Sequence, residues 1–327
     1  MANRFRDFSP IMAGGILSVA AARDGQPLLS AVLLDLAVAV FLAVLASNLL
    51  RAVSRPKSIL IGKDGPHAAL VLFTWVAACG VLGARLASLL PAAPYIFGGL
   101  ATLGWIGAIA ISAAFVLNQF RDGAANAVRG SWLLAVVATQ SLSILAGTDV
   151  GELGSRVAID LSFGFWALGL ALYLVLIMLI VRRLVRGEVG LGDLTPDYWI
   201  TMGALAISTV GLTDVLHGMG GSFLSQVFAG AVVATWLGGA AWVPYLCVAE
   251  ILRVRRRGAG VSYNPLRWST VFPLGMFSLA TFDFARTIAL PFLNSLAQLA
   301  FWAGLALALL NTTAAVRAVA GANRRTC

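Results

Sequence analysis

Charged residues are scarce in this 327-residue chain: Asp, Glu, Lys and Arg make up 11% of it, whereas soluble globular domains carry about a quarter. Hydrophobic residues make up 60%, and the mean hydropathy is +0.90. No stretch between the apolar runs is long enough for a soluble domain. We therefore expect a single transmembrane domain that covers residues 1–327.

The residues from which cofactor sites are built are also few. The three cysteines form no CxxC or Cys/His cluster, which argues against a disulfide framework or a metal site. The two histidines cannot form an intramembrane pair for haem b, and both lysines lie in one loop, which excludes a retinal Schiff base. The phosphate-binding loop of ATP-hydrolysing proteins is absent. Without a cluster of polar catalytic groups, we expect no enzyme and no cofactor.

Long apolar runs, in contrast, are abundant. Runs of about twenty such residues between short polar loops are typical of a polytopic helical membrane protein. We predict an all-α fold of ten transmembrane helices, over residues 8–22, 29–50, 67–90, 95–118, 131–147, 157–182, 198–217, 223–252, 270–292 and 294–318. The first run also resembles a signal peptide, but it takes part in an internal repeat, so we expect it to be retained.

The basic residues are distributed unevenly between the loops. Of the 23 Lys and Arg residues, nineteen lie in one set of alternate loops, two (Arg23 and Arg156) in the other, and two (Arg85 and Arg286) inside predicted spans. Positive charge marks cytoplasmic loops. The net charge of +9 therefore reflects membrane topology rather than nucleic-acid binding. Both termini are predicted to be cytoplasmic, in a multi-pass protein of the plasma or inner membrane.

The odd-numbered runs resemble one another. Each begins with an aromatic residue and continues with small residues at mid-depth, whereas the even runs are mostly smoother and suited to facing lipid. This pattern predicts five tandem helix hairpins, with the odd helices as an inner ring around a central pore. Helix breaks beside a water-filled path free backbone N–H groups that favour anions. The candidate pore-lining or helix-breaking residues are Gly14, Gly15, Gly80, Gly83, Ala138, Thr139, Gly203, Pro273 and Gly275. Close helix packing is the simpler interpretation of any one of them; their repetition favours a pore.

Residues 268–286 hold the candidate gate. Phe272 precedes Pro273, and a large apolar ring in a narrow pore blocks ions by excluding water; the alternative is ordinary packing. Asp283 and Arg286 are three residues apart and can pair on one helix face. With Arg85 they either line an outer vestibule that attracts anions or serve a structural role.

Four stretches of the chain are similar to a known family. They are residues 8–18 (FSPIMAGGILS), 132–141 (WLLAVVATQS), 198–208 (YWITMGALAIS) and 268–281 (WSTVFPLGMFSLAT). They resemble the tellurite-resistance/dicarboxylate transporter family, which includes plant slow anion channels and yeast malate and sulfite transporters. The resemblance implies a homotrimer with one pore per subunit and a gating phenylalanine at the position of Phe272. Family members often carry proline where this chain has Ala135, so its fifth helix is expected to be less kinked.

These features lead to three functional hypotheses. The first is an anion channel or facilitative transporter for small anions such as chloride, nitrate, sulfite or C4-dicarboxylates. The second is a proton-coupled dicarboxylate or sulfite exporter that uses Asp283, Arg286 or Asp214 in coupling. The third is a membrane scaffold or sensor without flux, which the lack of a soluble domain disfavours.

Overall fold

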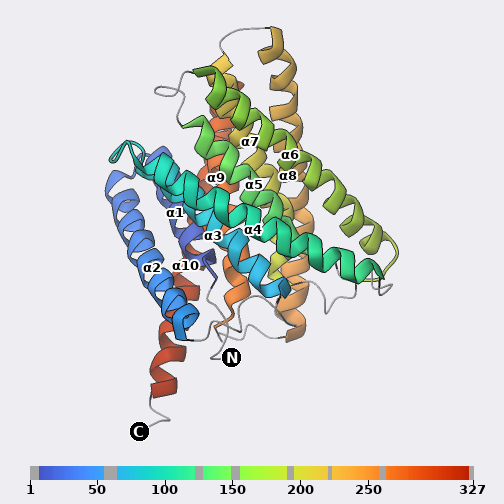
Figure 1. Cartoon of the computed structure of the whole chain (residues 1–327). Coiled ribbons are helices and arrows are strands. Elements are labelled where there is room, and N and C mark those ends of the chain that lie inside the picture. The colour runs from blue at the N-terminus through green and yellow to red at the C-terminus, as the bar shows by residue number, and fades with distance from the viewer. Residues whose placement is uncertain are drawn as a thin grey trace.

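The computed structural model describes residues 7–54, 65–121, 128–148, 155–189, 195–219, 223–257 and 263–323. Within these ranges the secondary structure is entirely helical (Figure 1). The ten long helices are α1 (Ser9–Arg23), α2 (Pro27–Ser54), α3 (Gly65–Leu86), α4 (Ala93–Arg121), α5 (Leu134–Gly147), α6 (Ser155–Val185), α7 (Ile200–Met219), α8 (Phe223–Arg257), α9 (Trp268–Thr287) and α10 (Leu293–Asn323). They confirm the all-α fold of ten predicted helices.

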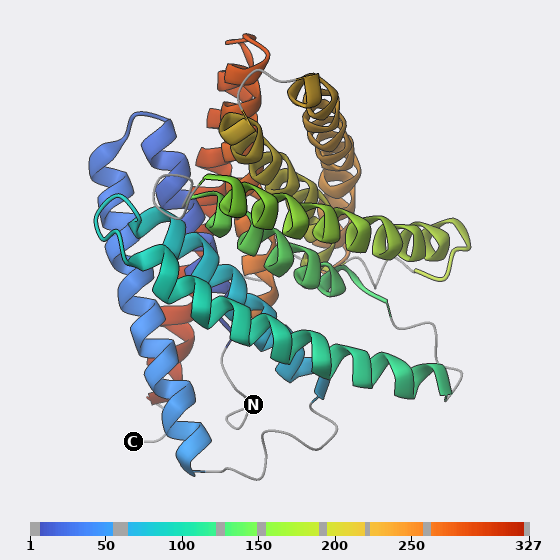
Figure 2. The ribbon, with the colours of Figure 1, turned by 45° about the horizontal axis from the view of Figure 1, so that its top comes forward.

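Consecutive helices pair as five hairpins, and the odd helices form a closed ring. Each odd helix packs against the even helix that follows it, and α1 contacts α3, α3 contacts α5, α5 contacts α7 and α7 contacts α9. The ring closes where α9 packs against α1, although these helices stand at opposite ends of the chain. Figure 2 shows the even helices spread around this inner group.

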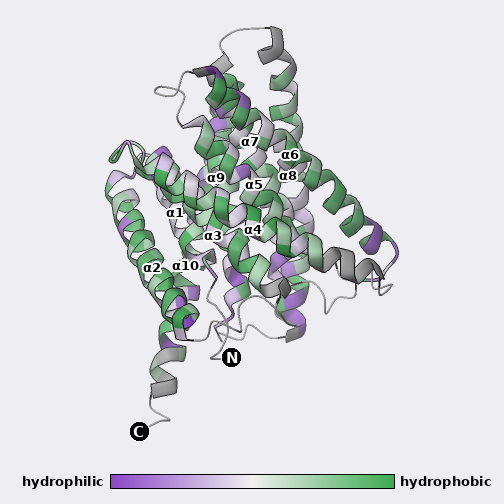
Figure 3. Cartoon of the chain, viewed as in Figure 1, coloured by the Kyte–Doolittle hydropathy of each residue, from purple (hydrophilic) through white to green (hydrophobic). Residues whose placement is uncertain are grey.

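The inner and outer helices differ in burial. In the most apolar stretch of α7, 89% of the residues are buried, against 11% in α4. The exposed surfaces of the even helices are strongly apolar, as the hydropathy colours of Figure 3 show along α2. Even helices therefore shield the odd ones from lipid, as the sequence pattern predicted.

Eight helices in the described part of the chain are long and apolar enough to cross a membrane by themselves, and α1 and α9 are not among them. Helix α1 has only 15 residues, and α9 carries Asp283 and Arg286. Both belong to the inner ring, where neighbouring helices rather than lipid surround them. A short or partly polar helix is tolerated there because its polar groups do not have to face hydrocarbon.

Glycines allow the ring helices to approach one another closely. A Cβ atom on Gly80 would lie 2.6 Å from the Cβ of Ser141 on α5, and one on Gly203 would lie 2.9 Å from the Cβ of Pro273 on α9. Real Cβ contacts are essentially never closer than 3.0 Å. Small residues in membrane helices commonly serve this purpose.

Polar side chains join the two helices of several hairpins. Ser18 and Ser30 each donate their hydroxyl to the other's carbonyl oxygen across α1 and α2, at 2.8 and 2.7 Å. Ser143 and Ser162 repeat this exchange between α5 and α6, at 2.7 and 2.8 Å. The repetition in two hairpins supports the internal repeat that the sequence predicted.

We expect Gly203→Val to lower the free energy of unfolding by about 1–3 kcal/mol, because the new side chain would overlap the rigid ring of Pro273. Gly164→Val is the matched control, since a Cβ at Gly164 on the outer helix α6 has no neighbour within 4 Å. Thermal unfolding of the two purified variants measures the difference, and equal melting temperatures would contradict the close contact.

Candidate functional site

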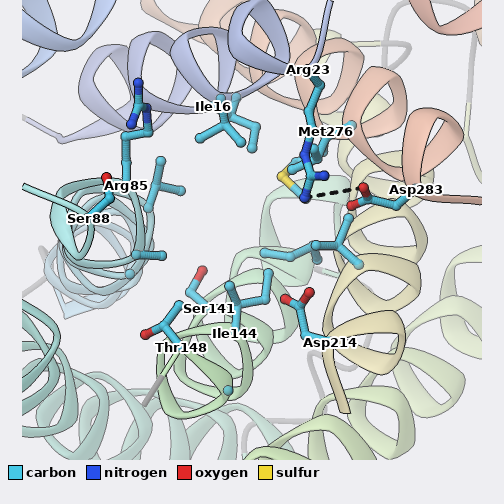
Figure 4. A pocket seen from close by; sticks show the side chains of 18 residues that line it. Ile16, Arg23, Arg85, Ser88, Ser141, Ile144, Thr148, Asp214, Met276 and Asp283 are labelled. Atoms are coloured by element: carbon cyan, nitrogen blue, oxygen red, sulfur yellow. Dashed lines mark ion pairs between the residues drawn. The ribbon is translucent and has the colours of Figure 1, made fainter. Parts of the chain in front are cut away.

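A cavity of about 510 Å³ lies inside the ring of odd helices. Its lining comes from α1, α3, α5, α7 and α9, or from residues that directly follow α3 and α5, and from no even helix in the described part of the chain. The lining residues belong to the middle and C-terminal parts of these helices or to the residues just after them. The cavity therefore lies toward the end of the bundle at which the odd helices finish, and Figure 4 shows the side chains that line it.

Apolar and small residues line the deep end of the cavity. Ile16, Ile207 and Met276 lie there, together with Gly80 and Ser141. These residues occupy the positions along their helices that are farthest from the C-terminal ends among those that line the cavity.

Phe272 is placed just beyond this deep end. It is completely buried and does not line the cavity. The spacing of Phe272, Met276, Leu279 and Asp283 puts all four on one face of α9, and the last three do line the cavity. Phe272 lies one turn, about 6 Å, nearer the start of α9 than Met276. Helix α9 continues through Pro273 without interruption.

An ion pair crosses the seam between α1 and α9 at the open end of the cavity. Arg23 Nη2 lies 3.3 Å from Asp283 Oδ1, with the arginine side chain 40% exposed and the carboxylate 6% exposed (Figure 4). The sequence suggested that Asp283 and Arg286 can pair; the ion pair described here joins Asp283 to Arg23 instead. Asp283 faces the interior of the ring, whereas Arg286 is exposed on the outside of the same helix.

Arg85 brings a second positive charge to the cavity. Its Nε donates to Ser18 Oγ at 3.3 Å, and its Nη2 donates to Ser30 Oγ at 2.9 Å, so the two serines that join α1 to α2 also hold this side chain. The guanidinium forms no ion pair with a described residue. Among the described residues, the hydrogen bonds of this guanidinium therefore go to neutral hydroxyls.

Asp214 of α7 lines the cavity on the side away from Arg85 (Figure 4). It is half-buried and forms no hydrogen bond or ion pair with another described residue. Sequence reasoning considered Asp214 only for proton coupling and assigned Arg23 to a loop. The signal for Arg23 was present, because it is one of only two basic residues in its set of loops.

The nine residues predicted to line the pore or break helices are placed differently. Gly80 lines this cavity, while the others pack between helices away from it. Gly275, for example, would bring a Cβ within 2.8 Å of Ile16 Cγ2, and Thr139 accepts a hydrogen bond from Trp105 at 2.8 Å. The residues outside the cavity are Gly14, Gly15, Gly83, Ala138, Thr139, Gly203, Pro273 and Gly275.

No group of three or more His, Cys, Asp or Glu residues in the described part of the chain could hold a metal ion. The cavity instead offers two arginines, two aspartates and several hydroxyls inside a closed ring of membrane helices. This arrangement defines a membrane protein with a cavity that holds charged residues and is enclosed by the inner helices of its bundle.

Comparison with known proteins gives the family. Residues 6–316 match the SLAC1 family, described as voltage-dependent anion channel, and the chain belongs to this family. The match covers nearly the whole chain and confirms the resemblance. The family consists of anion channels and transporters rather than enzymes.

Two curated relatives come from Mycobacterium tuberculosis. The uncharacterized membrane proteins MT1776 (strain CDC 1551) and Rv1735c (strain H37Rv) are each 31% identical to this chain over 138 residues. The aligned region covers 41% of this chain and 70% of each relative. Their description as membrane proteins agrees with the helical membrane fold of this chain, and both are described as uncharacterized.

We expect Arg23→Ala to lower the free energy of unfolding by about 1–3 kcal/mol, because it removes a charged partner from the buried carboxylate of Asp283. Arg156→Ala provides the control, since it removes an exposed arginine near the start of α6. Thermal unfolding in detergent compares the two, and equal losses would show that the ion pair does not stabilise the ring.

Proposed function

We propose that this protein is an anion channel or facilitative transporter whose pore runs through the ring of odd helices and is closed by Phe272. Small anions such as chloride, nitrate, sulfite and C4-dicarboxylates are the proposed permeants. The main support is the cavity itself, which all five odd helices line and to which Arg85 contributes a positive charge without an acidic partner among the described residues.

The position of Phe272 supports its role as the gate. Apolar and small residues line the deep end of the cavity, and Phe272 follows one turn further along the same face of α9. A dry, apolar constriction is a barrier to ions because an ion passing through it must give up its water. Replacing the phenyl group of Phe272 with a smaller side chain would leave space that water can enter.

The proposed orientation places the cavity on the outer side of the membrane. The odd helices begin on the side that carries most of the Lys and Arg residues, which is the cytoplasmic side by the positive-inside rule. Both termini are then cytoplasmic, in the plasma or inner membrane. We further propose a homotrimer with one pore per subunit, in line with the family resemblance; the apolar surfaces of the even helices suit both lipid and neighbouring subunits.

A second candidate function is proton-coupled export of dicarboxylates or sulfite. It is favoured by the two carboxyl groups in the cavity, Asp214 and Asp283, since carboxylates inside membrane proteins commonly serve as proton relays. Transport that stops when the pH gradient is collapsed, and that is lost in Asp283→Asn, would support coupling. Currents that reverse at the Nernst potential of the anion, at every pH, would support the channel.

We expect Phe272→Ala to conduct anions at least several-fold better than the wild-type protein in planar bilayers or oocytes, because it opens the apolar constriction. Phe301→Ala is a matched control: Phe301 on α10 is the same residue type, is equally buried and lies outside the inner ring. Both truncations leave a core void, so a general loss of packing would affect both variants.

The comparison separates gating from destabilisation. Larger currents in Phe272→Ala alone support the gate. Equal currents in both variants and the wild type, with the proteins shown to be folded by size-exclusion chromatography, would overturn the gate assignment. A Phe272→Ala variant that passes no anion at all would overturn the proposed function.

A further inference from the structure

Two opposite charges in the cavity remain without an ion-pair partner among the described residues. Arg23 and Asp283 neutralise each other, which leaves Arg85 on α3 and Asp214 on α7. These two helices are not adjacent in the ring, and Figure 4 shows the two side chains on opposite sides of the cavity. An anion that enters between them meets an attractive side and a repulsive one.

Arg85 retains hydrogen-bond donors for such an anion. Its two bonds to Ser18 and Ser30 use Nε and Nη2, whereas a guanidinium has five N–H groups. The serines fix the side chain in place, so a ligand does not have to order it. Arg85 is therefore a pre-organised anion-binding group.

Asp214 determines which anions can bind favourably next to Arg85. A carboxylate only accepts hydrogen bonds, so it repels an anion that has no hydrogen to donate, such as chloride or nitrate. An anion that carries an O–H group can direct it at Asp214 while its negative oxygens face Arg85. The unfavourable contact then becomes a charge-assisted hydrogen bond, formed directly or through a water molecule.

The other charged residues in the cavity do not alter this selection. Asp283 repels the carboxylate of Asp214 and Arg23 attracts it, so the two members of the ion pair act on Asp214 in opposite directions. Ser141 and Thr148 already donate their hydroxyls to the carbonyl oxygens of Val137 and Leu145, at 2.8 and 2.7 Å, so toward the cavity these two hydroxyls act as acceptors. The volume of about 510 Å³ leaves room for a small anion with several waters, since a water molecule occupies about 30 Å³.

We propose that Arg85 and Asp214 form a two-point site that selects monoanions carrying their own O–H donor over monoanions without one. This inference rests on the proposed function for its biological meaning, but the binding site it describes exists in the closed cavity. Asp214 is thus a specificity-determining residue, and Arg85 supplies attraction common to all anions.

Bicarbonate and nitrate are suitable probes because both are planar monoanions with four heavy atoms, and only bicarbonate has an O–H group. Their dissociation constants can be measured from the ligand-induced rise in melting temperature of the purified full-length protein. Mildly alkaline pH keeps bicarbonate the main carbonate species, and ionic strength is matched. The ratio of the two constants is compared between variants, because differences in hydration of the two anions then cancel.

We expect Asp214→Asn to reduce the preference for bicarbonate over nitrate roughly tenfold, since it removes both the charged acceptor and the repulsion of nitrate. Asp214→Glu, which keeps the charge, should retain most of the preference. Asp24→Asn is the control for loss of a carboxylate at the same end of the bundle, because Asp24 binds Gln298 at 2.8 Å and does not line the cavity. Arg85→Gln should weaken both anions by similar factors.

The outcomes distinguish this inference from the proposed function. An unchanged preference in Asp214→Asn, or an equal fall in Asp24→Asn, overturns the two-point site even if anion currents are observed. Selective binding of bicarbonate together with an absence of flux in Phe272→Ala overturns the channel and leaves the site intact. If Asp214→Asn does not fold, the other two variants still test the site: a lost preference in Asp214→Glu, or a preference that falls in Arg85→Gln, overturns the two-point arrangement.

Discussion

Polar groups inside a lipid bilayer must find partners within the protein, because hydrocarbon offers none. This constraint accounts for the division of the bundle into two layers. The even helices place apolar side chains outward, and the odd helices keep most of their serines and threonines buried. The ring must also close, and it does so where α9 meets α1. The Arg23–Asp283 ion pair lies at this junction.

The shielded interior allows the protein to use helices that could not span a membrane alone. Helix α1 is short, and α9 carries charges, but both are enclosed by neighbours. Tight contacts at glycines bring the ring helices close together, and the cavity lies within the ring they form. The same close packing buries Phe272 completely below that cavity. In our proposed closed state, the phenyl group of Phe272 is consequently enough to fill the remaining space between the odd helices.

The effect of the charged side chains in the cavity depends on which of them pair with each other. Four charged side chains would sum to zero, yet the pairing of two of them leaves Arg85 and Asp214 as separate sites of opposite sign. Arg85 is held by the serine exchange that also joins the first hairpin. Helix packing and the proposed anion recognition therefore depend on the same hydroxyl groups, which links the stability of the first hairpin to the properties of the proposed pore.

The sequence by itself determined the fold class, the ten helices, the hairpin repeat and the family. These can be predicted from local patterns. The length of each apolar run, the positions of small residues and the distribution of Lys and Arg between loops are all read directly along the chain. It also selected Phe272, although its role as a gate stays a prediction.

Only the tertiary structure decided which polar residues meet. The ion pair of Asp283 and Arg23 joins residues that are 260 positions apart in the sequence, on the first and last helices of the ring. The pattern along α9 had suggested Arg286 as the partner of Asp283. Likewise, most of the small residues that were predicted to line the pore pack against neighbouring helices. Asp214 and Arg85 lie on opposite sides of one cavity. Which face of a helix points inward, and which helix stands opposite, is set by how the hairpins pack around the ring, and no single stretch of sequence contains that information.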